Sequence, residues 1–276
     1  MNPHQRYPIS LTSIFHSYWR NRELIWQMTK RDVIGRYRGS VMGIAWSFFN
    51  PVLMLAVYTF VFSMVFKSRW GVGGEESRTD FAIILFVGMI VHSLFAECIN
   101  RAPGLVISNP NYVKKVVFPL EILPFVAMGS TLFHTAISFV VLVIFYFFLH
   151  TQIHWTIVFI PLILLPLILA SLGFAWILAS LGVFIRDIGQ ATTILTTILL
   201  FLSPVFYPIS ILPSRYQLWM HLNPLTYMIE ETRSVFIWGQ LPNWAAWCTY
   251  TAISFMTAWL GFWWFQRTRK GFADVI

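Results

Sequence analysis

Long apolar runs without a charged side chain constrain this fold more than any other feature of the sequence. A helix needs about 20 apolar residues to cross the hydrocarbon core of a bilayer. Residues 151–183 and 188–214 contain no Asp, Glu, Lys or Arg. The runs predict an all-α integral membrane protein with six transmembrane helices, over residues 44–66, 81–100, 122–149, 155–185, 188–207 and 241–266. We expect residues 1–43 to form an N-terminal interface helix and 44–276 a single transmembrane domain.

The composition agrees with a membrane protein. Charged residues make up 11% of the chain and hydrophobic residues 57%, whereas about 25% of a soluble domain is charged. An unusually apolar soluble protein would lack the charges to cover its surface. The formal net charge is +8, which in a soluble protein would suggest nucleic acid.

The distribution of positive charge predicts the orientation of the chain. With the termini inside, the inside segments carry fourteen Lys or Arg and the outside segments five. Because cytoplasmic loops collect Lys and Arg, both termini are expected in the cytoplasm. Topology and anionic lipid headgroups then account for the excess positive charge, and no nucleic acid partner is expected.

Arg186 and Asp187 stand side by side between two charge-free runs. We interpret them as the cytoplasmic turn between the fourth and fifth spans. A charged pair at this place stops a membrane segment, and it can also contact a partner. The residues alone leave both roles open.

Three further segments are helical without being long enough to span. Residues 10–38 have apolar positions at helical spacing with basic residues beside them, which indicates an amphipathic helix in the interface plane. This helix is a membrane-surface anchor, or it also forms a collar against a cytoplasmic partner. Residues 109–119 contain a short basic and apolar helix that lies on headgroups or fits a partner's groove. Residues 214–222 and 224–238, split by Asn223-Pro224, predict two short re-entrant helices between the fifth and sixth spans.

Several kinds of chemistry have no motif in the sequence. It contains neither G-x-x-x-x-G-K-[ST] nor G-x-G-x-x-G, and its seven histidines are scattered. Its two cysteines make neither a disulfide framework nor a metal site. We therefore expect no catalytic residue, no metal site and no cofactor in this chain.

Four motifs, in this order, carry a resemblance to a known family. They are RDVIGRYRGSVMGIAWSFFNPVLMLAVYTFVFSMVF (31–66), NPNYVKKVVFP (109–119), RDIGQ…LSPVFYP (186–208) and LNPLTYMIEETR (222–233). From about residue 20 onward the chain resembles the permease subunit of bacterial polysaccharide ABC exporters, which handle O-antigen, capsule and teichoic acid. The family fold has an interface helix, six transmembrane helices and two re-entrant helices before the last span.

The resemblance implies a mechanism and partners. The permease forms a homodimer in the bacterial cytoplasmic (inner) membrane, and two copies of an ABC ATPase subunit hold ATP and Mg²⁺. The implied substrate is a polyprenyl-pyrophosphate-linked glycan, with O-antigen the expected one. The residues implied to couple to the ATPase are Asn109, Tyr112, Val113, Lys114, Lys115, Arg186 and Asp187. Arg36 and Arg38 are the candidates for the lipid pyrophosphate.

An outer gate is predicted between the fifth and sixth spans. Its residues are Pro204, Tyr207, Pro208, Asn223, Pro224, Glu230 and Arg233. The prolines break helices because each lacks a backbone donor. Glu230 and Arg233 are three residues apart, so they can meet on one helix face. If they form an ion pair near the apolar region, removing both should be milder than removing Glu230 alone; a plain surface pair is the alternative.

Two other functions compete with polysaccharide export. The first is a drug- or lipid-exporting ABC permease of the same fold. The second is an integral-membrane enzyme acting on polyprenyl-linked sugars, which would need a cluster of acidic residues or histidines at the membrane surface.

Overall fold

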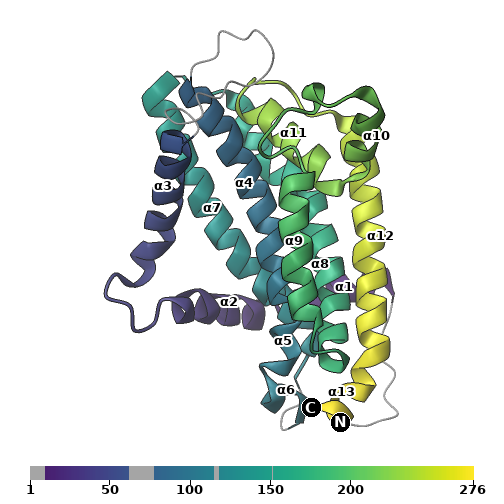
Figure 1. Ribbon diagram of the computed structural model, residues 1–276. Helices are drawn as coiled ribbons and strands as arrows, with labels where there is room; N and C mark the ends of the chain where they lie inside the picture. Colours follow the sequence, from purple (N-terminus) through teal and green to yellow (C-terminus); the bar gives the residue numbers. More distant parts are fainter. Residues whose placement is uncertain (1–9, 62–77, 115–117, 151) are drawn as a thin grey trace.

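The computed structural model describes residues 10–61, 78–114, 118–150 and 152–276. Every regular element in these ranges is a helix. Long helices stand side by side, and two helices near the N-terminus run across them (Figure 1). The all-α prediction is therefore confirmed.

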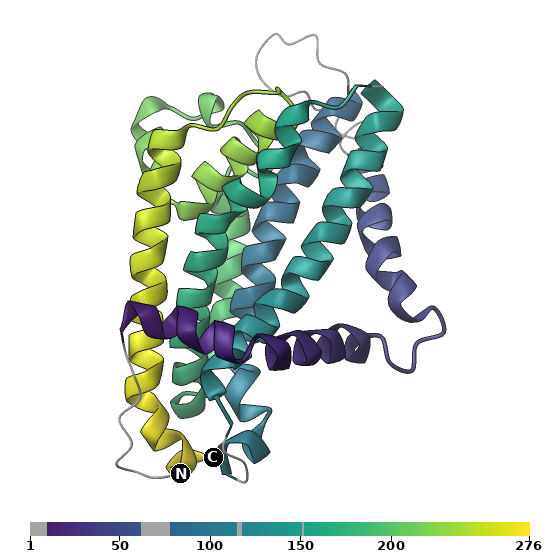
Figure 2. The same cartoon turned by 180° about the vertical axis from the view of Figure 1, so that it is seen from behind.

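The N-terminal segment forms two helices in place of the single predicted one. They are α1 (Leu11–Arg20) and α2 (Arg22–Arg36). The break falls at Asn21, whose side chain donates to the Ser17 carbonyl at 2.8 Å. Together α1 and α2 form a rod that crosses the long helices almost at right angles (Figure 2). We call this pair the N-terminal rod.

Six helices that run along the long axis make up the body of the molecule. They are α3 (Trp46–Tyr58), α4 (Arg78–Arg101), α7 (Leu123–His150), α8 (Ile160–Phe184), α9 (Ile188–Leu202) and α12 (Trp244–Thr268). In the described residues, four helical stretches are long and apolar enough to cross a membrane: Gly43–Val61, Asp80–Arg101, Leu120–His150 and Trp155–Phe184. They correspond to the first four predicted spans.

The fifth and sixth predicted spans differ from the sequence prediction. Helix α9 ends at Leu202, not at Tyr207, because Pro204 lacks the donor that the next turn needs. Its 15 residues cover about 22 Å at a rise of 1.5 Å per residue. Helix α12 is long enough with 25 residues, but its Trp, Tyr and Thr side chains lower its mean hydropathy. It begins at Trp244, after the Asn243 cap, rather than at Leu241.

Helices α8 and α12 pack with their backbones almost touching. A methyl group placed on Gly261 would come within 2.1 Å of the Gly173 carbonyl oxygen. Glycine at both positions removes the side chains that would hold the helices apart. Trp176 and Phe262 pack nearby, with ring centroids 5.3 Å apart, and both are fully buried.

The remaining helices are short and lie at the two ends of the bundle. At the end that carries the C-terminus are α5 (Gly104–Ile107), α6 (Pro110–Lys114), η6 (Arg269–Gly271) and α13 (Phe272–Val275). At the opposite end are α10 (Ser214–Leu222) and α11 (Pro224–Phe236). Short 3-10 turns, η1 (Gly43–Ala45), η3 (Leu120–Ile122), η4 (Trp155–Phe159) and η5 (Ile209–Ile211), connect the longer elements.

Candidate functional site

The predicted coupling loop folds as two short helices, α5 and α6, between α4 and α7. Asn109 donates its side-chain amide to the Leu105 carbonyl at 3.0 Å and so ends α5. Val113 is buried, and the Tyr112 ring stacks on Phe118 with centroids 4.3 Å apart. These three side chains hold the loop in shape, while Lys114 is exposed. Lys115 lies outside the described residues.

Both helices of the N-terminal rod contact the coupling loop, and Ser17 on α1 donates to the Glu121 carboxylate at 3.4 Å. Arg31 on α2 donates to the Tyr112 hydroxyl at 2.9 Å. This hydrogen bond links α6 to the rod.

Arg186 and Asp187 lie exposed in the turn between α8 and α9, as predicted. The Asp187 carbonyl accepts hydrogen bonds from the Gln190 and Ala191 amides, each at 3.0 Å. The same end of α8 presses against the start of α5: a methyl group on Gly182 would meet the Pro103 carbonyl oxygen at 2.3 Å. The structure thus brings both predicted coupling elements to one end of the bundle (Figure 1).

A buried charge cluster behind this face was missed by the sequence analysis. Arg269, after α12, donates to the Glu121 carboxylate at 2.5 Å and to the Phe118 carbonyl at 2.7 Å. Trp176 on α8 donates to the Glu121 carbonyl at 3.0 Å, and Arg269 is 4% exposed. The cluster ties the exit of the coupling loop to α8 and α12. Its only sequence signal is a Glu two residues after the Pro119 break, and the partner, Arg269, lies 148 residues away.

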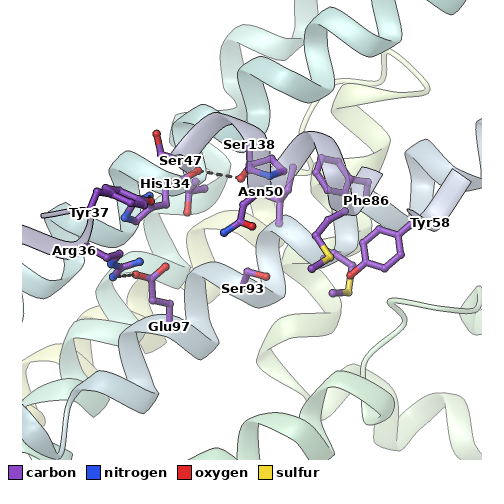
Figure 3. Close-up of a pocket in the computed structure, with 15 residues that line it drawn as sticks. Arg36, Tyr37, Ser47, Asn50, Tyr58, Phe86, Ser93, Glu97, His134 and Ser138 are labelled. Carbon is purple, nitrogen blue, oxygen red and sulfur yellow. Dashed lines mark hydrogen bonds and ion pairs between the residues drawn. The ribbon is translucent and has the colours of Figure 1, made fainter. Parts of the chain in front are cut away.

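Arg36 lies at one end of a polar pocket of about 280 Å³ between α2, α3, α4 and α7. Figure 3 shows Arg36 facing Glu97 at this end, with Asn50 and Ser93 along the pocket and Tyr58 at the far end. Arg36 and Glu97 form an ion pair.

The charges around Arg36 balance one another. Arg101 binds Asp32 at 2.7 Å and lies 3.9 Å from the Glu97 carboxylate. The network therefore contains two guanidinium groups and two carboxylates, which makes Arg36 a weaker anion ligand than its position in the sequence suggests. Arg38 follows the end of α2 and is exposed.

At the opposite end, Arg233 is the centre of the predicted outer gate. It is fully buried and donates to the carbonyls of Ile84, Pro204 and Val205 at 3.0, 2.5 and 2.9 Å. Its pair with Glu230 has a 3.1 Å contact, and the Glu230 side chain is 36% exposed. Burial lowers the pKa of Arg233 to about 10, so the side chain stays charged at neutral pH.

This geometry confirms the predicted ion pair, and it also shows that Arg233 has a structural role of its own. Arg233 joins α11 to α4 and to the segment after α9, so the pair is not a plain surface pair. The sequence suggested that removing both partners is milder than removing Glu230 alone, and these contacts give a reason to expect the opposite. The loss of Arg233 leaves three carbonyls without their donor, whatever happens to Glu230.

The other predicted gate residues lie around the same junction. Asn223 donates to the Leu202 carbonyl at 3.1 Å and to the Ser203 hydroxyl at 2.9 Å, and its oxygen caps α11 at the Leu225 amide. The Tyr207 hydroxyl donates to the Phe201 carbonyl at 2.9 Å. Pro204 and Pro208 are buried, while Pro224 begins α11 and is exposed. These contacts fasten the end of α9 to the start of α11.

The described architecture defines a class: a multi-pass helical membrane protein with short helices packed at both ends of the bundle. Residues 23–237 match the ABC-2 type transporter family, and the chain belongs to this family. It is therefore a transport subunit and not an enzyme, and ABC-2 permeases work with ATPase subunits.

Individual relatives match over most of the chain. The O-antigen export system permease protein RfbA of Myxococcus xanthus is 25% identical over 260 residues, which are 94% of this chain and 97% of the relative. The polysialic acid transport protein KpsM of Escherichia coli is 22% identical, over 76% of this chain and 80% of its own. The inner membrane transport permease YadH of Escherichia coli K12 is 27% identical, over 81% of this chain and 86% of its own.

Proposed function

We propose that the chain is the channel-forming permease subunit of an ATP-driven exporter that moves a polyprenyl-pyrophosphate-linked polysaccharide, of the O-antigen class, across the bacterial inner membrane. The observation that carries this proposal is the near full-length similarity to a protein named as an O-antigen export permease. The four ordered motifs and the pair of short helices before α12 support it.

The proposed topology has six spans with both termini in the cytoplasm. Helices α9 and α12 complete the set begun by the four long apolar stretches. The Lys and Arg distribution supports this orientation, and it puts α5, α6 and α13 on the cytoplasmic side.

We assign ATPase docking to this cytoplasmic end. Lys114, Arg186 and Asp187 are exposed charged side chains at this end, and we assign them to the contact with the partner. Asn109, Tyr112 and Val113 keep α6 in place, and Lys115 completes the basic pair in sequence. ATP and Mg²⁺ belong to two copies of the partner subunit in this scheme.

The partner that completes the channel is a second copy of the chain. Helix α3 stands away from the bundle (Figure 1). Only 11% of the apolar 18-residue stretch within Gly43–Val61 is buried. Helix α9 also leaves large apolar side chains exposed, among them Ile194, Ile198 and Phe201. Pairing of these two helices between protomers would cover both faces.

Pyrophosphate recognition is proposed for Arg38 together with Arg36. Arg38 supplies the unbalanced charge, whereas Arg36 contributes when Glu97 releases it. The pocket beside Arg36 has amide and hydroxyl groups from Asn50 and Ser93, which suit hydrogen bonding to phosphate oxygens or sugar hydroxyls.

The outer gate is proposed to move at α10, not at Arg233. A movement that separates Arg233 from its acceptors would leave a buried cation without partners, which costs free energy. Helix α10 exposes Tyr216, Leu218 and Trp219, so it can tilt while α11 stays fastened by Arg233 and Asn223.

The test uses inside-out membrane vesicles that contain this chain and its ATPase subunit, together with a polyprenyl-pyrophosphate-linked glycan. ATP should make the glycan resistant to a glycosidase added outside, because export moves it into the lumen. Vesicles whose ATPase subunit cannot hydrolyse ATP are the control. Equal digestion with and without ATP would refute polysaccharide export.

A second candidate is an ABC permease for drugs or lipids. The similarity to a relative named only as an inner membrane transport permease favours it. The same vesicles distinguish the two, because ATP-driven uptake of fluorescent drugs or short-chain lipids without glycan protection would select this alternative. An enzyme of polyprenyl-linked sugars is excluded by the family.

A further inference from the structure

A large apolar groove lies between the N-terminal rod and the bundle. Its volume is about 920 Å³. Helix α8 forms the floor with Leu165, Leu172 and Trp176, and α7 and α12 form the walls. The rod closes one end, where it crosses in front of α12 and α7 (Figure 2).

The groove has the length of one membrane leaflet. Trp176 is level with the rod, since Glu121 accepts from both Trp176 and Ser17 of α1. From Trp176 to Leu165 the floor spans eleven residues, or about 16 Å at 1.5 Å per residue. Half of a hydrocarbon core of about 30 Å is about 15 Å. The groove therefore runs from the interface to the middle of the membrane.

The end of the groove at the rod is basic. Arg22 and His16 line it, and none of the lining residues in the described part of the chain is acidic. The Arg22 guanidinium lies over the Trp19 ring at 5.0 Å and donates to the Trp19 carbonyl at 3.1 Å. Both contacts leave donors of this exposed side chain available, because a guanidinium has five N–H groups.

Large aromatic side chains at the mouth of the groove are not covered by the protein itself. Phe15, Trp19 and Trp26 are 61%, 67% and 70% exposed, although all three line the groove. Tryptophan and arginine together are suited to the headgroup level, where one part of a ligand is apolar and another is charged. The surface of the groove is therefore complementary to an elongated apolar ligand with an anionic end.

We infer that the groove is a binding site for one anionic phospholipid, with an acyl chain along α8 and the phosphate at Arg22. The positive charge of Arg22 favours an anionic headgroup, and the length of the groove along α8 suits one acyl chain. With the proposed orientation, the lipid comes from the cytoplasmic leaflet. It fills the space between α1 and α8, so it fastens the rod to the bundle near the coupling loop.

The experiment places the purified full chain in nanodiscs of equal parts phosphatidylethanolamine and phosphatidylglycerol. Traces of either lipid with a photoreactive group on the acyl chain are added, and the labelled peptides are identified by mass spectrometry. Phosphatidylglycerol should label the α8 peptide with Leu165 and Leu172 about fivefold more than phosphatidylethanolamine, the equivalent of about 1 kcal/mol per basic side chain at an anionic surface.

Matched variants test the two halves of the site separately. Arg22→Ala should remove the preference for phosphatidylglycerol, whereas Lys30→Ala, which removes one exposed charge from the same rod outside the groove, should keep it. Leu165→Trp fills the groove and should lower labelling by both lipids. Val140→Trp, at an exposed position of α7 outside the groove, should not.

Three results would overturn the inference. Equal labelling by the two lipids would mean ordinary annular contact. An unchanged preference in Arg22→Ala would remove the headgroup assignment, even if Leu165→Trp fails to fold. Stronger competition by a polyprenyl phosphate than by phosphatidylglycerol would make the groove a substrate subsite. The assay needs no transport, so its failure leaves the proposed exporter function untouched.

Discussion

Replacing Arg233 by alanine removes the cation that holds three segments together at the end of the bundle opposite the C-terminus. The side chain is fully buried and donates to three carbonyls, on Ile84, Pro204 and Val205. Breaking a buried charge network by removing one partner costs about 3–5 kcal/mol. Glu230→Ala should cost only about 1 kcal/mol, because the Glu230 side chain is 36% exposed and water screens such a pair.

The assay is thermal unfolding of the purified chain in mild detergent, followed by its intrinsic fluorescence. At about 2–4 °C for each kcal/mol, Arg233→Ala should lower the midpoint by about 6–20 °C and Glu230→Ala by about 2–4 °C. Arg233→Lys should fall between them, since an ammonium group cannot reach three carbonyls in the manner of a guanidinium fork.

Arg215→Ala on α10 is the matched control, because Arg215 is exposed and its loss should change the unfolding free energy by less than about 0.5 kcal/mol. The double variant of Glu230 and Arg233 should be at least as unstable as Arg233→Ala. A midpoint of Arg233→Ala within about 2 °C of wild type would refute the reasoning, because a surface substitution has an effect of that size.

Three further predictions concern orientation, coupling and substrate. In a background without the exposed native cysteine, a cysteine at Gln240 should react with an impermeant thiol reagent in spheroplasts, while one at Ser108 should not; labelling at Ser108 would overturn the orientation. The chain alone should hydrolyse no ATP, and Lys114→Glu should weaken co-purification of the ATPase subunit or uncouple hydrolysis from export; normal export by this variant would remove the docking role. Arg38→Ala should reduce export of the glycan more than Arg36→Ala, because Glu97 already neutralises Arg36; the reverse order would make Arg36 the phosphate ligand.

Local signals in the sequence predicted several boundaries well. The predicted helix over 214–222 has the bounds of α10, since Pro213 precedes it and Asn223-Pro224 follows it. The turn at Arg186-Asp187 separates α8 from α9 as expected. Prolines, caps and charges act within a few residues, so a single sequence contains what is needed to place them.

Contacts between distant segments were beyond the sequence analysis. The ion pair of Arg36 with Glu97 joins residues 61 positions apart, and it changes the charge available at the predicted pyrophosphate site. The spacing of Glu230 and Arg233 predicted their pair, but not that Arg233 is buried against carbonyls of α4 and the end of α9. Those carbonyls are backbone groups, which every residue type has, so the sequence does not identify them as partners of Arg233.

The contact of α8 with α12 has a consequence for how the chain is made. The glycine face of α8 meets its partner only after Gly261 has been synthesised, 88 positions after Gly173. At about 5–20 residues per second, this interval lasts roughly 4–18 s. During this time α12 is not yet present to pack against α8. A nascent chain that stops before α12 therefore leaves the glycine face of α8 without the helix that packs against it.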